Sequence, residues 1–126
     1  MNTNAHTGKI GEEIAKNFLV GKGYEVLGSN YRKHHGEIDI VARERDTLVF
    51  VEVKTILNRN IDDVTRETYR PEFNVHKEKI RVISRTAELY MLENRILSDW
   101  RIDLVAIEMQ LEPRKAKIRH LKSISL

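Results

Sequence analysis

The chain of 126 residues contains no cysteine, which excludes disulfide bonds and metal sites built on thiolates. Its unbroken apolar runs are short, as in LVFV at 48–51, so no segment is expected to span a membrane. The first residues, MNTNAHTGKIGEE, lack the apolar stretch of a signal peptide, and we expect a cytoplasmic protein. The formal net charge of +3 permits a polyanionic partner without requiring one.

The length fits one domain, residues 1–126, with its own hydrophobic core. The apolar spacing predicts the order α-β-β-β-α-β-β, an α/β fold with a mixed sheet flanked by helices. Two segments, 1–7 and 56–72, show no clear period and are expected to be mobile; the second carries Arg59, Arg66 and Arg70. One helix is predicted at 8–20, with Thr7 as its cap and Gly21 or Gly23 as its stop, and a second at 74–93, with Asn74 as its cap. The first predicted strand, 24–32, is expected to be irregular at Gly28. The other predicted strands are 37–43, 47–55, 101–109 and 116–124.

The predicted strand 47–55 is apolar on both faces over most of its length, which favours a central, covered position in the sheet. Side chains alternate between faces along a strand, so Glu52 and Lys54 lie on the same face, near the strand's end. Charged side chains are rarely buried without a partner, so this pair needs an explanation.

The turn before this strand predicts what lies opposite Glu52. A two- or four-residue loop centred on Arg45 and Asp46 pairs residues whose numbers sum to 91, which places Asp39 opposite Glu52 with Cβ atoms about 5 Å apart. A three-residue loop would shift the pairing by one residue.

Like charges directly opposite one another destabilise a sheet, and a divalent cation between Asp39 and Glu52 would remove that repulsion. Two carboxylates plus water form a common Mg²⁺ site, and the charge of Lys54 would then stabilise a scissile phosphate or contact a metal-bound water. The alternative places Asp39 in water at a strand end and pairs Lys54 with Glu37 across the strands.

The first helix adds Glu12 at the margin of its apolar arc, where it can reach the sheet, whereas Glu13 points towards solvent. In the alternative, Glu12 only stabilises the helix N-terminus electrostatically. The histidines at 34 and 35 could bind metal or phosphate, or form a polar turn.

The second helix carries Lys77, Arg81 and Arg85 at four-residue spacing, away from its apolar face. Such a row can follow the phosphates of a nucleic acid, or it can be a solvated face.

These motifs together resemble a known family. GKIGEEIA, GYEVLGSNYR, GEIDIVARERDTLVFVEVKT and RIDLVAI, spread over residues 8 to 110, are similar to the YraN family of small bacterial proteins. That family belongs to the restriction-endonuclease-like superfamily and is most similar to archaeal Holliday-junction resolvases.

The resemblance implies roles residue by residue. Asp39 and Glu52 correspond to the metal ligands, assisted by the carbonyl of Val53, and Lys54 to the residue that orients or activates the attacking water. Glu12 follows the GxxGE pattern and corresponds to a glutamate that holds metal through water. Lys77 is the closest match to a polar residue on the second helix; its usual neighbour, glutamine, is replaced by Glu78, so no role is carried to that position. Asp103 matches a family aspartate without a known role.

The interpretation is a Mg²⁺-dependent DNA endonuclease, with Mn²⁺ as a substitute, acting on branched or otherwise structured DNA. Resolvases use two active sites, so the resemblance alone points to a homodimer. The alternative is a DNA-binding or DNA-repair accessory module with little activity of its own. The intact Asp39, Glu52 and Lys54 favour the enzyme, and the modest positive charge disfavours very tight autonomous DNA binding.

Overall fold

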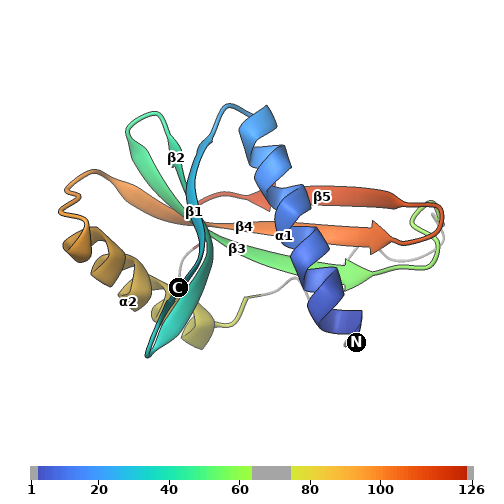
Figure 1. Ribbon diagram of the computed structural model, residues 1–126, viewed down its shortest axis with the longest axis horizontal. Coiled ribbons are helices and arrows are strands. Elements are labelled where there is room, and N and C mark those ends of the chain that lie inside the picture. The colour runs from blue at the N-terminus through green and yellow to red at the C-terminus, as the bar shows by residue number, and fades with distance from the viewer. Residues whose placement is uncertain (1–2, 64–74, 125–126) are drawn as a thin grey trace.

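A computed structural model describes residues 3–63 and 75–124, with side chains from residue 6 onward (Figure 1). The predicted order α-β-β-β-α-β-β and the mixed α/β class are confirmed. The elements are α1 (Thr3–Gly21), β1 (Glu25–Lys33), β2 (Gly36–Glu44), β3 (Thr47–Leu57), α2 (Lys77–Glu93), β4 (Trp100–Gln110) and β5 (Lys115–Leu121).

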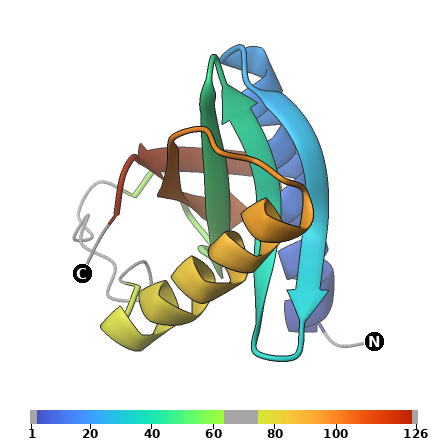
Figure 2. The same cartoon turned by 90° about the vertical axis from the view of Figure 1, so that its left-hand side faces the viewer.

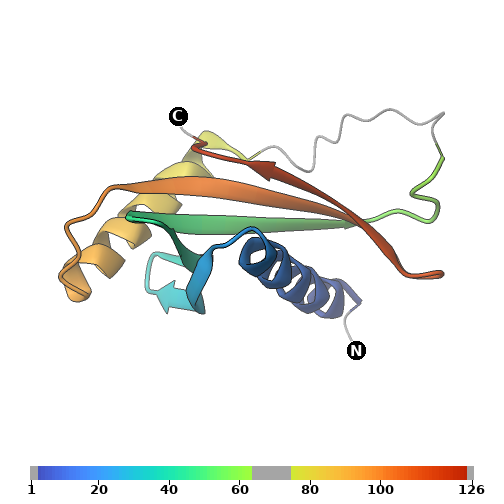
Figure 3. The ribbon, with the colours of Figure 1, turned by 90° about the horizontal axis from the view of Figure 1, so that it is seen from above.

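One five-stranded sheet has the spatial order β1-β2-β3-β4-β5, which makes β3 the central strand as predicted. The β3–β4 pair is parallel, whereas the other three pairs are antiparallel. Seen from above, β3 and β4 run together along the length of the molecule (Figure 3).

The two helices cover opposite faces of this sheet (Figure 2). Ala15 and Leu19 of α1 pack with Val49 and Val51 of β3 in one core cluster. The intervening β3 residue Phe50 packs on the other face, in a cluster with the buried side of α2. Apolar residues on both faces of β3 are therefore explained by two helices, one on each side.

The helix ends differ from prediction at their N-termini. No proline or glycine separates Thr3 from Thr7, and α1 begins at Thr3, so Thr7 is a buried residue within the helix rather than its cap. The stop is as predicted: α1 ends at Gly21, Gly23 has a φ of 94°, and the Tyr24 N–H donates to the Leu19 carbonyl at 3.0 Å.

At the start of α2, His76 occupies the N-cap position without a side-chain capping bond. Asn74, the predicted cap, lies outside the described residues, as do Arg66 and Arg70. Among the segments expected to be mobile, residues 3–7 belong to α1 and residues 56–57 to β3.

The β2–β3 hairpin has the predicted register. Its five pairs run from Glu44↔Thr47 to Ile40↔Val51, and each pair sums to 91. Arg45 in the two-residue turn has a φ of 56°, as tight hairpin turns require. The pairing ends at Ile40↔Val51, so Asp39 lies one position beyond the paired ladder.

The predicted irregularity of the first strand is also confirmed, because the β1–β2 register shifts between Val26 and Gly28. After β3 the chain stays attached to the sheet: Asn58 N–H donates to the Met109 carbonyl, and the buried Ile61 donates its N–H to Gln110 Oε1, both at 2.8 Å. Arg59 is exposed beside this attachment.

Asp103, for which the sequence offers no role, is fully buried in β4. It accepts hydrogen bonds from Arg101 Nε at 2.9 Å and the Ser123 N–H at 3.0 Å, and it lies 2.7 Å from His120 Nε2. Burial alone would raise the pKa of Asp103, but the bonds from His120 and Arg101 outweigh it and hold that pKa below its ordinary value. Asp103 thus attaches the C-terminal segment to the sheet, far along the chain from the carboxylates of β2 and β3.

Gly11 lets α1 approach β3 closely. A Cβ at this position would lie 2.0 Å from Thr55 Oγ1 and 3.0 Å from Thr55 Cβ, whereas a Cβ at Gly8 would meet nothing within 4 Å. Both glycines are helical, but only Gly11 is required by packing. The contact fixes α1, and with it Glu12, against the end of β3.

We therefore expect Gly11→Ala to lower the free energy of unfolding by about 1–3 kcal/mol through overpacking. Gly8→Ala, the matched control, should raise it by about 0.5–1 kcal/mol because alanine favours a helix. Urea denaturation measures both, and Thr55→Ala should partly rescue the Gly11 variant. Equal effects of the two glycine substitutions would contradict the close contact.

Candidate functional site

A cavity of about 450 Å³ opens at the end of β3. It collects the predicted site residues from three elements: Glu12 from α1, Asp39 from β2, and Glu52, Val53 and Lys54 from β3. The remaining lining residues are Thr7, Gly8, Thr55, Ile56 and Leu57. Residues far apart in the sequence therefore meet in one place: the hairpin register predicts that Asp39 approaches Glu52, and the helical arc predicts that Glu12 can reach them.

The position of Asp39 is fixed by the end of the β2–β3 ladder. Beyond Ile40↔Val51 the main chains no longer pair, and Asp39 Oδ2 accepts the Val53 N–H at 2.8 Å instead. The carboxylate thus satisfies a main-chain donor and is held beside Glu52.

Both carboxyl groups titrate above their ordinary range. Burial raises the pKa of Asp39 to about 6, against the opposing effect of the Val53 hydrogen bond, and the charges of Glu12 and Glu37 add to the rise. Burial and then the charge of Asp39 raise the pKa of Glu52 to about 7. A site that raises the pKa values of both Asp39 and Glu52 favours the neutral carboxyl groups until a bound cation compensates the negative charge.

Glu12 is half-buried, lines the cavity and accepts a hydrogen bond from Asn30 Nδ2 at 3.2 Å. Glu13 is exposed and pairs with Lys16 at 3.1 Å, outside the cavity. The structure therefore separates the two glutamates of α1 in the way that the helical arc predicts.

The lysine of α2 nearest the carboxylates is Lys79, and not Lys77. Lys79 Nζ lies 3.8 Å from Glu52 Oε1, and its charge lowers the pKa of both Asp39 and Glu52. Both lysines are exposed and neither lines the cavity, so the contact with Glu52 is what distinguishes Lys79 from Lys77. The sequence holds no signal that separates the two lysines, because Lys79 lies four residues before the buried Ile83 and Lys77 three residues before the buried Ile80.

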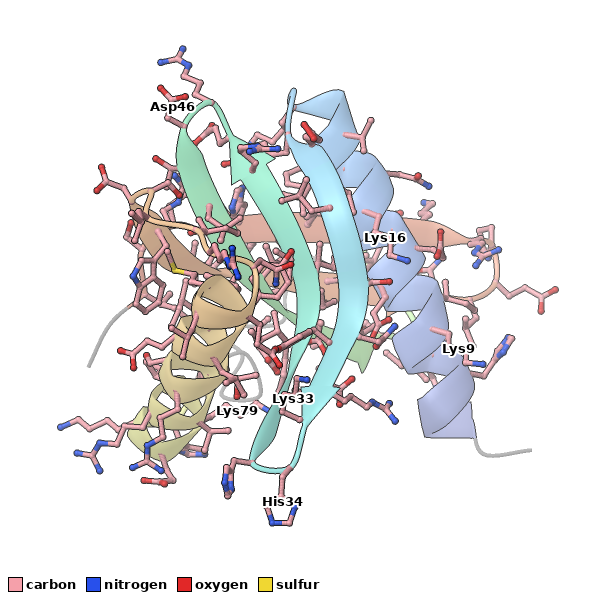
Figure 4. All side chains as sticks on the ribbon, turned by 60° about the vertical axis from the view of Figure 1, so that its left-hand side comes forward. Lys9, Lys16, Lys33, His34, Asp46 and Lys79 are labelled. Carbon is pink, nitrogen blue, oxygen red and sulfur yellow. The ribbon has the colours of Figure 1, made fainter. Side chains whose placement is uncertain are left out.

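The row Lys77, Arg81 and Arg85 is exposed as predicted, and Arg81 pairs with Glu78 at 3.5 Å. At 100° per residue this row lies on the flank of α2 opposite to Lys79, so it faces away from the cavity. His34 (Figure 4) and His35 form an exposed turn in which their rings lie 4.7 Å apart, and neither lines the cavity.

The oxygen donors suit a hard divalent cation. Asp39 and Glu52 offer carboxylate oxygens, and Val53, which lines the same cavity, offers its main-chain carbonyl. Within residues 3–63 and 75–124, no group of three or more histidine, aspartate or glutamate side chains could hold a metal ion. Two carboxylates, a carbonyl and retained water fit Mg²⁺, which keeps much of its hydration shell.

The raised pKa values predict the pH response of the metal-free protein. A carboxyl whose pKa is raised by folding stabilises the fold at low pH, and that stability is lost as the pH rises through about 6 and 7 for Asp39 and Glu52. Asp39→Asn keeps an acceptor for the Val53 N–H but carries no charge. Near pH 8 in EDTA we expect this variant to be as stable as the wild type or more stable, by up to about 1–3 kcal/mol, with the difference vanishing near pH 4.

Thermal melting across this pH range measures the difference, with Asp46→Asn in the exposed β2–β3 turn as the control for loss of one charge. A lower melting temperature for Asp39→Asn at every pH would show that Asp39 is a structural hydrogen-bond acceptor rather than a strained carboxylate.

Comparisons with known proteins agree with the sequence motifs. The sequence model of the uncharacterised protein family UPF0102 matches residues 11–107. A UPF0102 protein of Alkaliphilus oremlandii is 40% identical over 121 residues, covering 95% of this chain and 97% of that protein. One of Syntrophus aciditrophicus is 39% identical over 123 residues (97% and 90%), and one of Thermotoga maritima 39% over 99 residues (79% and 83%).

Within the part of the chain that the structure describes, no helix has the length and apolar character needed to cross a membrane. The match covers most of the chain and includes the cavity-lining residues from Glu12 to Leu57, whereas Thr7 and Gly8 precede it. The chain belongs to the uncharacterised protein family UPF0102, which is the YraN family that its motifs resemble.

Proposed function

We propose that this protein is a metal-dependent endonuclease that hydrolyses phosphodiester bonds in DNA. The observation that carries the proposal is the pair Asp39 and Glu52, both with raised pKa values, in one cavity with Lys54. A purely structural site would gain nothing from two crowded carboxylates that folding forces towards protonation.

Asp39, Glu52 and the Val53 carbonyl are the proposed ligands of Mg²⁺ or Mn²⁺, with Glu12 acting through a water. The bound cation would lower the pKa of a coordinated water and neutralise charge on the phosphate. Lys54 is exposed at the cavity and, by strand alternation, lies on the same face as Glu52. Its ammonium orients the attacking water and stabilises the negative charge that develops on the phosphate.

The substrate class follows from the family resemblance. Similarity to archaeal Holliday-junction resolvases favours branched DNA, a role in DNA repair in the cytoplasm, and a homodimer that presents two cavities to one junction.

A second function is favoured by one observation, the row Lys77, Arg81 and Arg85 on the flank of α2 that faces away from the cavity. A positive surface separated from the carboxylates suits an accessory module that binds DNA without cleaving it.

Cleavage of a panel of branched and linear DNAs with Mg²⁺ or Mn²⁺ separates the two functions, because wild type should cut at least one branched substrate if the enzyme assignment holds.

Lys54→Ala should abolish cleavage, with a loss of at least about 10²-fold, because it removes charge stabilisation from the transition state. The variant should keep its fold and the rise in melting temperature that Mn²⁺ causes, since Lys54 is not a ligand. Lys16→Ala is the control, because Lys16 pairs with Glu13 of α1 and does not line the cavity. Full cleavage by the Lys54 variant would refute its assignment, and a wild type that cuts none of the DNAs would favour the accessory module.

The basic row makes a separate prediction. Replacing Lys77, Arg81 and Arg85 together with glutamine should weaken DNA binding and flatten its log–log salt dependence by up to about one unit per lost phosphate contact. The control with the same change in net charge replaces Arg45, Arg95 and Arg119, which are exposed elsewhere. Fluorescence anisotropy in Ca²⁺ at several salt concentrations measures both, and identical slopes for the two triple variants would show that the row is only a solvated face.

A further inference from the structure

Lys79 of α2 contacts one of the two carboxylates of the site. Its Nζ is 3.8 Å from Glu52 Oε1; the side chain of Lys79 is 49% exposed, whereas that of Glu52 is only 12% exposed. Its charge acts on Asp39 as well as on Glu52. Among the described residues, Lys79 is the cation that the structure places in salt-bridge contact with this carboxylate pair.

The backbone that carries Lys79 is held firmly, although its side chain is half-exposed. Val82 and Thr86 follow Lys79 by three and seven residues on the same flank of α2. This flank packs on Gly36 of β2, where an added Cβ would lie 2.5 Å from Val82 Cγ1 and 2.7 Å from Thr86 Oγ1. This close packing holds the flank of α2 against β2, whereas the side chain of Lys79 is half-exposed and flexible.

Lys79 and the β1–β2 turn lie at the same end of the molecule. Figure 4 shows Lys79 at the end that also holds Lys33 and His34, with Asp46 at the opposite end of the sheet. The Lys79 side chain is 49% exposed, so an ammonium that left Glu52 would be accessible to a phosphate group from solvent.

Resting on the proposed function, we propose that Lys79 is the internal counter-ion of the metal-free site: it neutralises the Asp39–Glu52 pair, a divalent cation displaces it from Glu52, and its released ammonium then binds a DNA phosphate. Lys79 and the metal compete for the same carboxylate, since both are cations within reach of Glu52. Metal binding and DNA binding are thereby coupled through one side chain, and the coupling acts equally in both directions.

Titration calorimetry with Mn²⁺ alone near pH 8 tests the competition. Lys79→Met should bind Mn²⁺ about two- to tenfold more tightly than wild type, because the competing cation is gone. Lys77→Met makes the same charge change two residues away on the flank that faces away from the site, and its affinity should be unchanged. Lys79→Arg, which keeps the charge, should remain close to wild type.

Lysine labelling of the wild type provides a second measurement that needs no variant. Acetylation of Lys79, followed by mass spectrometry, should rise when Mn²⁺ is added, whereas labelling of Lys77 should not. The same release predicts that Mn²⁺ strengthens DNA binding less in Lys79→Met than in wild type.

The outcomes separate this inference from the proposed function. If wild type binds Mn²⁺ and Lys79→Met binds it equally or more weakly, with Lys79 labelling unchanged, the counter-ion assignment is wrong and the metal site stands. If wild type binds no Mn²⁺, both the metal site and the displacement of Lys79 are refuted.

Discussion

The candidate site depends on where the β2–β3 ladder stops. Main-chain pairing ends at Ile40↔Val51, and one residue later the Asp39 carboxylate accepts the Val53 N–H. If the ladder continued, the Val53 N–H would donate to a main-chain carbonyl of β2 and could not bind the Asp39 carboxylate. The early end of the ladder thus brings two carboxylates into one cavity and leaves both with raised pKa values.

Two glycines position the helices around this carboxylate pair. Gly11 brings α1 against Thr55 of β3, and Gly36 brings β2 against Val82 and Thr86 of α2. A charged residue lies close to each contact in the sequence. Glu12 directly follows Gly11, and Lys79 lies one helical turn before Val82. Close backbone approach on both faces of the sheet therefore places a negative and a positive side chain on either side of Asp39 and Glu52. The packing at these two glycines thus positions the backbones from which Glu12 and Lys79 extend.

Local patterns predicted the elements and the hairpin, but not every neighbour of the site. Alternation along β3 and the two-residue turn determine the hairpin register that brings Asp39 close to Glu52, because both are properties of adjacent residues. The choice between Lys77 and Lys79 is different: the two lie about 80° to either side of the apolar face of α2, so periodicity alone treats them alike. Only the contact of α2 with Gly36 decides which flank faces β2. Asp103 was also beyond local reasoning, because its partners His120 and Ser123 lie 17 and 20 residues away.

Asp103 and Glu52 are both shielded from solvent, but their neighbours differ, and this difference explains why Asp103 is structural whereas Glu52 suits a functional site. Asp103 is fully buried, yet hydrogen bonds from Arg101, His120 and the Ser123 N–H lower its pKa, so its ionised form stabilises the fold. Glu52 has an ion pair with Lys79 at 3.8 Å, and burial together with the charge of Asp39 still raises its pKa to about 7. The same chain thus satisfies one buried carboxylate completely and leaves another under-compensated beside an open cavity. Negative charge without full compensation lowers the stability of the fold. Two such carboxylates beside one cavity provide the charge that a cation-binding site requires.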